Sequence, residues 1–302
     1  AASEIDPDYV TGLLKYRNEI YVFNRNTIEV FDDTGGSGFP FSRVSGGLIP
    51  KGCVGTHAKC LFAETFAWLG SARNEANSVY VASGGSAVKI ATREVEERIA
   101  AYTEEELTDV LVEAKADRLH QHLYVHLPNE TLVYDATASL VAGQPVWFFI
   151  STGVSGIHPY RAQNFVYAYG KWIVGDTQDG RIGFVDETVM SQYGEVTGWT
   201  FETPLIYNQS KGGIVNSLEL VGTTGRAPFG EDPSVFHSYT LDGLTWSDER
   251  QAGLGTAGQT QKRVVWRSDG KFDNFRGERF RGANTCPISW ARLEAEIEPL
   301  NA

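Results

Sequence analysis

The chain opens with two apolar runs joined by a polar hinge at residues 24–26. Residues 20–23 are apolar at every position, whereas residues 27–31 alternate between polar and apolar side chains for three positions. A continuous apolar run suits a strand buried on both faces, and alternation suits a strand with one face in water. The pair predicts a hairpin whose first strand is buried and whose second strand is half exposed, the inside-to-outside order of a propeller blade.

Similar sets of short strands follow along the chain. Their leading strands begin near residues 20, 65, 122 and 164, a loose spacing that is typical of β-propeller blades once insertions are allowed. The repetition favours a propeller, with a sandwich of long meanders as the alternative. The other strands predicted in this part are 65–69, 78–82, 87–91, 122–127, 131–135, 146–150, 164–168, 171–174 and 181–185.

One helical insertion interrupts the series. Thr92 can cap a turn that carries Val95, Ile99 and Tyr102 at helical spacing, and residues 103–106 form a capping box that opens a second short helix. We expect this segment on a rim, with its acidic face in solvent.

After residue 209 the strand candidates become longer and alternate more regularly, and glycine-rich loops join them. We predict a boundary there, with a β-propeller portion over 1–209 and a small antiparallel β-sandwich over 210–302. The fold class is therefore all-β: a partial propeller of about four blades with a short helical insertion, followed by the sandwich. The sandwich strands are predicted at 215–221, 235–240, 262–267 and 289–297.

Charge and cysteine usage narrow the classes of function. The 302 residues carry 26 Lys and Arg against 38 Asp and Glu, a net charge of −12 that disfavours gripping nucleic acid through its phosphates. Cys53, Cys60 and Cys286 have no paired spacing and are expected to be reduced thiols of a protein made in a cytoplasm. The sequence begins without Met, and no apolar stretch is long enough for a membrane span.

Three histidines are the best candidates for metal chemistry. His120, His122 and His126 share strand parity, and a His-x-His pair is a known zinc geometry. A zinc site needs further ligands, and the apolar residues interleaved with the histidines suit ordinary blade packing. We therefore expect packing, with no metal, cofactor or catalytic residue assigned.

Residues 240–246 resemble the Asp-box turn of sialidase-like propellers, with one residue missing. We expect an Asp-Gly hairpin turn above Trp246. Glycoside cleavage requires a pair of carboxylates, but most acidic residues fall in turns or helix starts, such as Glu104–Glu106. The tryptophans are expected to pack in the core or between blades, namely Trp147, Trp172, Trp199, Trp246, Trp266 and Trp290.

Several stretches between Arg17 and Leu140 together resemble one family, and weaker similarity continues into the last domain. The matching stretches are residues 26–31, 101–106, 126–128, 132–136, 240–245 and 262–266. In their order and spacing they are similar to the packaged-DNA stabilisation protein, also called the tail accessory or hub protein, of short-tailed phages that infect enteric bacteria.

The resemblance implies a virion protein, made in the host cytoplasm, that assembles into a hexameric ring below the portal and adaptor. There it would close the DNA channel after packaging and serve as a platform for the tail needle and tailspikes. It implies no enzyme activity, and DNA would pass without sequence-specific binding. Family members carry further N-terminal blades, so we expect the chain to be either a fragment or a shortened member.

The structural role predicts partner contacts spread over loops such as Asp32–Gly47 and Arg226–Asp232. One alternative is a glycan-binding or glycan-cleaving propeller used in host adsorption, which would need a carboxylate pair and exposed aromatic residues. A second alternative is a host cytoplasmic propeller that scaffolds other proteins.

Overall fold

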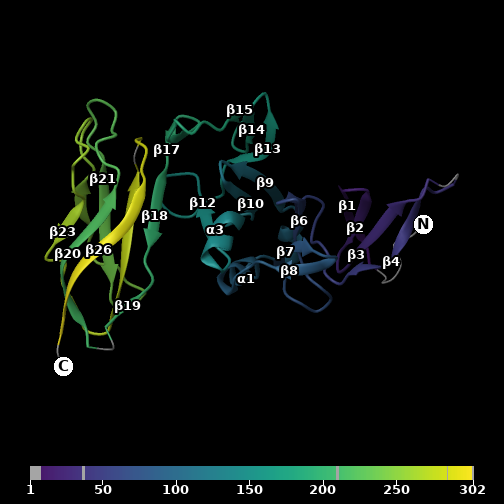
Figure 1. The fold of residues 1–302 in the computed structure, drawn as a ribbon, viewed down its shortest axis with the longest axis horizontal. Coiled ribbons are helices and arrows are strands. Elements are labelled where there is room, and N and C mark those ends of the chain that lie inside the picture. The colour runs from purple at the N-terminus through teal and green to yellow at the C-terminus, as the bar shows by residue number, and fades with distance from the viewer. Residues whose placement is uncertain (1–7, 36–37, 209–210, 284, 301–302) are drawn as a thin grey trace. The chain divides into compact units, whose positions relative to one another are not determined.

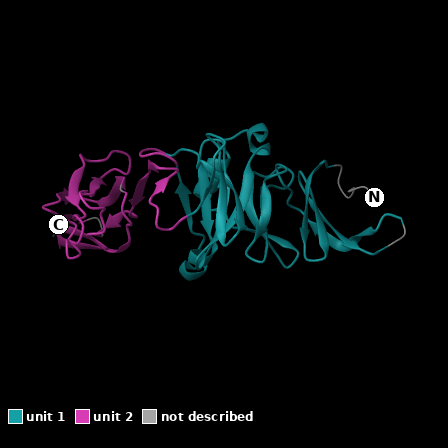
Figure 2. Cartoon of the chain, turned by 90° about the horizontal axis from the view of Figure 1, so that it is seen from above, with its two compact units in different colours: residues 1–151, 157–185 teal, residues 152–156, 186–302 magenta. Residues whose placement is uncertain are grey.

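The computed structural model describes residues 8–35, 38–208, 211–283 and 285–300, and the chain divides into two compact units (Figure 1, Figure 2). Unit 1 comprises residues 1–151 and 157–185, and unit 2 comprises residues 152–156 and 186–302. The chain therefore passes from one unit to the other three times, after residues 151, 156 and 185. The short segment 152–156 is held in unit 2, where the Gly198 amide donates to the Gly153 carbonyl at 2.8 Å.

Unit 1 is a series of antiparallel meanders, which we call blades 1 to 4 in chain order. Blades 1 to 3 have four strands each and blade 4 has three, and every strand pairs with its neighbour in sequence. Blade 1 contains β1 (Val10–Tyr16), β2 (Glu19–Asn24), β3 (Ile28–Asp33) and β4 (Phe41–Ile49), and blade 2 contains β5 (Lys59–Phe62), β6 (Thr65–Gly70), β7 (Ser78–Ser83) and β8 (Ser86–Lys89). Blade 3 contains β9 (Leu111–Asp117), β10 (His120–His126), β11 (Thr131–Asp135) and β12 (Trp147–Ile150), and blade 4 contains β13 (Ala162–Ala168), β14 (Lys171–Asp176) and β15 (Ile182–Phe184).

Aromatic side chains join each blade to the next. The rings of Phe23 and Phe66 meet edge to face at 5.7 Å between blades 1 and 2. Phe62 meets Tyr134 at 6.2 Å between blades 2 and 3, and Tyr124 meets Phe165 at 4.9 Å between blades 3 and 4. Such pairs combine a large buried apolar area with a preferred geometry. Successive blades are thus packed against one another through side-chain contacts, in addition to being connected by the chain.

The helical insertion lies between blades 2 and 3 in the chain and contributes to the same core. It consists of α1 (Arg93–Ile99) and α2 (Glu104–Thr108). Val95, Ile99 and Leu107 are buried in the hydrophobic cluster that also includes blades 1 to 3. Thr103 and Glu106 form the predicted capping box, in which each side chain accepts a hydrogen bond from the backbone amide of the other residue. A further helix, α3 (Ala136–Ala142), follows β11 and was not predicted.

Unit 2 is an antiparallel sandwich of two sheets, preceded in the chain by a separate two-stranded sheet. The strands are β16 (Ser191–Gln192), β17 (Glu195–Val196), β18 (Gly198–Glu202), β19 (Ile206–Tyr207), β20 (Gly213–Gly222), β21 (Ser234–Thr240), β22 (Arg250–Gly253), β23 (Val265–Arg267), β24 (Lys271–Phe272), β25 (Phe275–Ala283) and β26 (Trp290–Pro299). β16 pairs with β17 in the two-stranded sheet. The first sheet of the sandwich has the order β18-β25-β21-β22, with β19 also paired to β25, and the second has β20 paired to β23, β24 and β26. Val215, Leu218, Val235, Trp266 and Phe280 are among the residues of the buried cluster of unit 2.

The predicted burial of the opening hairpin is wrong. Residues 28–31 of β3 are buried, whereas residues 20–22 of β2 are only partly so. The apparent exposure of β3 rested on Glu29, but this carboxylate is buried and paired with Arg43 at 2.5 Å. Residues 20–23 also form the second strand of blade 1, since β1 precedes them. A paired charge inside a sheet has the same sequence pattern as a solvent-facing one.

The domain boundary predicted at residue 209 stays a prediction, because residues 209–210 lie outside the described residues. β18 and β19 precede that point in the chain and both pair with β25 of the sandwich. The three cysteines are free thiols, as predicted. Among the described residues, no helix has the length and apolar character needed to cross a membrane.

Candidate functional site

The candidate chemistry of unit 1 lies on one face of β10. His120, His122 and His126 point to the same side of this strand, as their parity predicts. The alternate residues of β10, Leu123 and Val125, belong to the buried core on the opposite side. Blade 3 therefore presents an apolar face to the core and a face of histidine and tyrosine residues on its other side.

Two of these histidines meet a carboxylate at the end of the neighbouring strand. Asp135, the last residue of β11, is the register partner of His122. Its Oδ2 lies 2.5 Å from His120 Nδ1 and 3.4 Å from His122 Nε2. Its other oxygen accepts from the Ala138 amide at 2.9 Å and so caps α3. The three side chains form one cluster, in which every ligand atom lies within 4.8 Å of the others.

Burial and hydrogen bonding act on the ionisation of this cluster in opposite directions. Burial alone would raise the pKa of Asp135, but hydrogen bonds from the Ala138 amide and His120 outweigh it and hold the pKa below its ordinary value. Burial lowers the pKa of His122 in spite of the attraction of Asp135. The cluster thus combines an ionised carboxylate with an imidazole that favours its neutral form.

His126 is not part of this cluster. Its Nε2 lies 2.8 Å from Glu113 Oε1 on β9, and its Nδ1 lies 3.3 Å from Thr131 Oγ1. Glu113 also accepts the backbone amides of Asn164 and Phe165 in β13, at 3.1 and 2.8 Å. The third histidine therefore orients a carboxylate that fastens blade 4 to blade 3.

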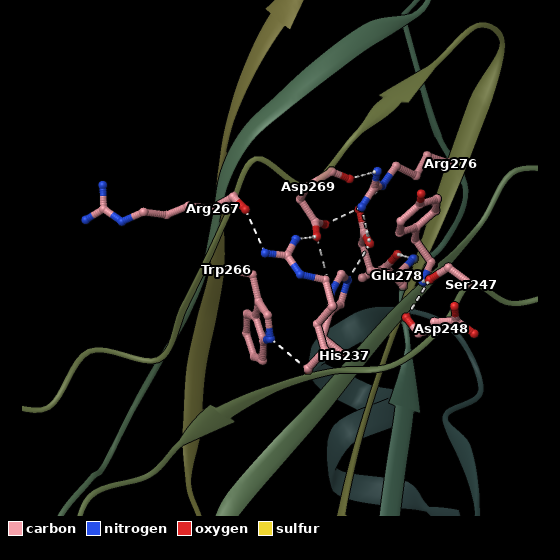
Figure 3. A network of polar contacts seen from close by, with 11 residues as sticks. His237, Ser247, Asp248, Trp266, Arg267, Asp269, Arg276 and Glu278 are labelled. Atoms are coloured by element: carbon pink, nitrogen blue, oxygen red, sulfur yellow. Dashed lines mark hydrogen bonds and ion pairs between the residues drawn. The ribbon is translucent and has the colours of Figure 1, made fainter.

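A second cluster of histidine and carboxylates lies inside unit 2 (Figure 3). His237 Nε2 lies 2.8 Å from Glu278 Oε2, and its Nδ1 lies 3.7 Å from Asp269 Oδ1. Arg276 donates to Glu278 Oε1 at 2.7 Å and makes an ion pair with Asp269. Arg250 reaches the same Asp269 carboxylate at 2.5 Å. All of these side chains except Arg250 are almost fully buried.

This second cluster is not accessible to a substrate or a further ligand. Two guanidinium groups already neutralise its two carboxylates, and no water-exposed side leads to His237, whose exposed fraction is 0%. The sequence alone does not reveal this cluster, because His237, Asp269 and Glu278 are scattered over β21, the turn before β24 and β25. The available signal was the Arg-x-Glu pair at residues 276 and 278, which strand parity places on one face.

The Asp-box-like segment forms a turn centred on one carboxylate. Asp242 accepts from the backbone amides of Leu244 and Thr245 at 2.8 and 2.7 Å, and the Thr245 hydroxyl donates to it at 2.6 Å. These hydrogen bonds, the one from Thr245 first, hold the pKa of Asp242 well below its ordinary value. The guanidinium of Arg279 lies over the ring of Trp246, 3.7 Å from its centroid. The carboxylate is thus used to shape the turn.

The tryptophans expected to pack do so to different degrees. Trp266 is buried, and Trp68 of blade 2 is fully buried as well. The remaining ones are half-buried, and they contact neighbouring rings, a hydrogen-bond partner or, for Trp246, the guanidinium of Arg279. For example, Trp147 Nε1 donates to the Ile90 carbonyl at 2.8 Å. Half-buried rings of this kind are Trp147, Trp172, Trp199, Trp246 and Trp290.

The two segments predicted to contact partners differ in structure. Residues 41–47 belong to β4, so most of the predicted loop Asp32–Gly47 is strand, and residues 36–37 lie outside the described residues. Residues 226–232 form an irregular loop whose Phe229 is 99% exposed. Phe39, just before β4, is 59% exposed and packs edge to face on Phe41 at 5.6 Å. Each segment therefore carries an exposed phenylalanine.

Comparison with known proteins identifies relatives of both units. A curated relative, "Tail hub protein gp10" of Salmonella phage P22, is 29% identical over 300 residues, which make up 98% of this chain and 62% of the relative. Among solved structures, exo-β-1,3-galactanase of Phanerochaete chrysosporium bound to β-1,3-galactotriose gives a TM-score of 0.30 at 9% identity, over 94% of this chain and 80% of that chain. A TM-score this low supports no inference.

Two family models match the chain in succession. The model described as "Bacteriophage P22 Gp10, beta-propeller" matches residues 1–190, and the one described as "Bacteriophage P22 Gp10, beta-sandwich" matches residues 198–298. They agree with the blades of unit 1 and the two packed sheets of unit 2. The chain therefore belongs to the bacteriophage P22 Gp10 family, as a β-propeller portion followed by a β-sandwich.

Proposed function

We propose that this chain is a structural component of a phage tail, without enzyme activity. The observation that carries the proposal is the match of both Gp10 family models, in the same order, over residues 1–190 and 198–298. The curated relative is named a tail hub protein, and this chain spans 62% of its length. We propose that this chain has the same role as that longer protein.

In the proposed role the chain forms a hexameric ring below the portal and adaptor, closes the DNA channel after packaging and supports the tail needle and tailspikes. Packed blades suit such a platform because a propeller presents its loops on a rigid body. The negative charge suits a channel wall, since favourable phosphate contacts would slow the passage of DNA.

Exposed phenylalanines in two segments are candidates for partner contacts. Phe229 and Phe39 present apolar rings to solvent in the segments predicted to meet other tail proteins. Aromatic side chains are enriched among the residues that dominate protein interfaces. We propose that the surfaces around these two rings bind neighbouring tail subunits.

Deletion of the gene in its phage tests the structural role. We expect particles that package DNA but lose it on storage, with wild-type protein supplied in trans restoring both DNA retention and infectivity. Mass spectrometry of purified restored particles should find the chain in a fixed ratio to the portal protein. Stable, infectious particles from the deletion phage would contradict the proposal.

Point variants test the contact surfaces separately from folding. Phe229→Ser should reduce incorporation of the protein into particles while its circular dichroism and unfolding temperature stay unchanged, because the side chain is already in water. Leu119→Ser, also on an exposed side chain, is the matched control. Equal incorporation of both variants would show that Phe229 contacts no partner.

A further inference from the structure

The cluster of His120, His122 and Asp135 has the composition of a transition-metal site. Two imidazoles and one carboxylate are the donor set that divalent ions such as Zn²⁺ bind in many proteins. The donors come from adjacent strands, β10 and β11, whose register places His122 opposite Asp135. A ladder of backbone hydrogen bonds thus fixes the backbone spacing of His122 and Asp135, and His120 lies two residues before His122 on the same face of β10.

The distances suit a tetrahedral ion after a small adjustment. Two ligands of a tetrahedral zinc, each about 2.1 Å from the ion, lie roughly 3.4 Å apart. His122 Nε2 and Asp135 Oδ2 are 3.4 Å apart. His120 Nδ1 is 2.5 Å from the same oxygen, at hydrogen-bond distance, and must withdraw by about 0.9 Å to share an ion. The side chain of His120 is 49% exposed, so its rotation meets little resistance.

The surroundings leave the donors available. The charge of Lys115, the register partner of His122 on β9, is paired with Asp117 at 2.8 Å. His122 Nδ1 is buried and makes no hydrogen bond, so it does not fix the ring to another protein group. The half-exposed side of His120 leaves room for water as a further ligand.

The cluster in unit 2 shows what a closed arrangement of the same residue types looks like. There Arg250 and Arg276 occupy the carboxylates of Asp269 and Glu278, so two positive charges stand where a cation would have to bind. Asp135, in contrast, makes its ion pairs with the imidazoles of His120 and His122. Imidazoles can release their protons to a metal near neutral pH, whereas guanidinium groups cannot.

We propose that His120, His122 and Asp135 bind a single Zn²⁺ ion at the end of the central β10–β11 pair of blade 3, where β11 leads into α3. The ion ties the two strands to each other and to the start of α3, because Asp135 also caps that helix. Water completes its coordination. The site adds a structural cross-link to a chain without disulfides among its three cysteines, and it does not depend on the proposed role in the tail.

Calorimetric titration of the untagged, chelator-treated chain with Zn²⁺ at about pH 7.5 tests the site. We expect one equivalent to bind, with an affinity reduced roughly 10- to 100-fold or more in His120→Ala and in Asp135→Asn. Asparagine also caps helices, so Asp135→Asn preserves the start of α3 while removing the anionic ligand. Co²⁺ should bind at the same site and give the visible absorption of a tetrahedral nitrogen and oxygen environment.

His158→Ala is the matched control, because His158 is exposed and belongs to neither cluster. We expect its zinc affinity to equal that of the wild-type chain, and circular dichroism should show all variants folded without metal. No saturable binding by the wild-type chain would overturn the proposal. Equal binding by wild type, His120→Ala and Asp135→Asn would also overturn it, since the ion would then sit elsewhere.

Discussion

Arg276 is 1% exposed, yet its guanidinium contacts two carboxylates and lies over an aromatic ring. Moving a charge out of water costs several kcal/mol, and only close, well-directed partners repay that cost. Asp269 and Glu278 provide them, and His237 completes the hydrogen bonding of Glu278. The stability of the sandwich depends on these buried groups being partners of one another, so the loss of one group leaves the others buried with fewer partners.

Replacement of Arg276 by leucine should destabilise unit 2 strongly. The change leaves Glu278 buried without its guanidinium partner and Asp269 with Arg250 as its remaining guanidinium partner, at a cost of about 3–5 kcal/mol in unfolding free energy. Urea unfolding followed by tryptophan fluorescence measures it. Arg292→Leu is the control, because Arg292 is 69% exposed and pairs only on the surface with Glu294; it should change stability by less than about 1 kcal/mol. Similar losses in both variants would refute the argument.

The same network predicts acid sensitivity. Burial raises the pKa of Glu278, but hydrogen bonds from His237 and Arg276 prevail and leave the pKa below its ordinary value. A depressed pKa stabilises the folded state above the ordinary value, and this stability is lost as the pH falls through the lower, folded value. Stability of unit 2 should therefore be level above about pH 5 and decline below about pH 4.5.

Glu278→Gln provides the test of this acid sensitivity. The variant is less stable at pH 7, but its urea midpoint should fall less steeply below pH 4.5, because the titrating group is gone. Midpoints measured at several pH values in both proteins decide the matter. Parallel pH profiles would mean that other carboxylates cause the decline.

At the scale of elements, Glu113 links two blades through backbone atoms. Its oxygens accept the amides of Asn164 and Phe165 in β13, while His126 holds the carboxylate from the other side. β13 has an irregular register with β14 between Gln163 and Val166, so these amides are served by Glu113 where the ladder fails. One side chain thus supplies hydrogen-bond acceptors to an edge strand of blade 4 at the point where its ladder is irregular.

Removal of this carboxylate should loosen β13 locally. Glu113→Ala leaves the amides of Asn164 and Phe165 without this acceptor and leaves His126 with its Thr131 contact, and an unsatisfied donor in a buried position costs about 1–3 kcal/mol. Hydrogen exchange of residues 164–165 should accelerate by roughly tenfold or more, with little change in blade 1. Glu105→Ala, on an exposed side chain of α2, is the control and should leave exchange in β13 unaltered. Unchanged exchange in Glu113→Ala would exclude the proposed link.

A glycine at the end of β6 permits the close approach of two backbone segments. A Cβ atom on Gly70 would lie 1.8 Å from the Gly52 carbonyl oxygen, far inside contact distance. Gly70→Ala should therefore lower the unfolding temperature of unit 1 strongly, by an amount equivalent to about 2 kcal/mol or more. Gly175→Ala in β14 meets only an ordinary contact at 3.5 Å and should be nearly neutral. Scanning calorimetry distinguishes them, and equal effects would be contrary evidence.

Among the strands that the sequence predicts, several owe their signal to apolar burial. β6, β7, β10 and β11 coincide closely with their predicted ranges, because each has a continuous or alternating apolar run. β9 and β25 were missed because they carry charged residues, Glu113 and Lys115 in one and Arg276 and Glu278 in the other. These charges are buried and paired, and pairing across distant segments leaves no periodic signal in one strand.

The candidate site was predictable only in part, for the same reason. Parity correctly placed His120 and His122 on one face, but it could not show that Asp135 would join them or that His126 would turn to Glu113. Those partners depend on strand register, which is set by the hairpin turns and by packing across blades. Composition and spacing supply the residue types, and register decides which of them meet.

At the scale of the whole molecule, net charge is the property most directly tied to the proposed channel. With 38 acidic against 26 basic side chains, the chain should not bind DNA through its phosphates. We expect no retardation of duplex DNA in a gel at about 10 µM protein and physiological salt, where non-specific binders with dissociation constants near 10⁻⁶ M would bind. A basic protein of similar size is the positive control. Retardation that weakens with salt would contradict the argument.

The chain passes between the two units three times, and this has a consequence for recombination between related genes. A single recombination event after residue 185 would exchange the sandwich but leave residues 152–156 of the former chain within it. The Gly153 carbonyl would then have to accept from a foreign strand where Gly198 now donates. Recombination that exchanges the sandwich must therefore also exchange residues 152–156, or this short segment must stay compatible with both sandwiches. We expect the two parts of the chain to evolve together for this reason.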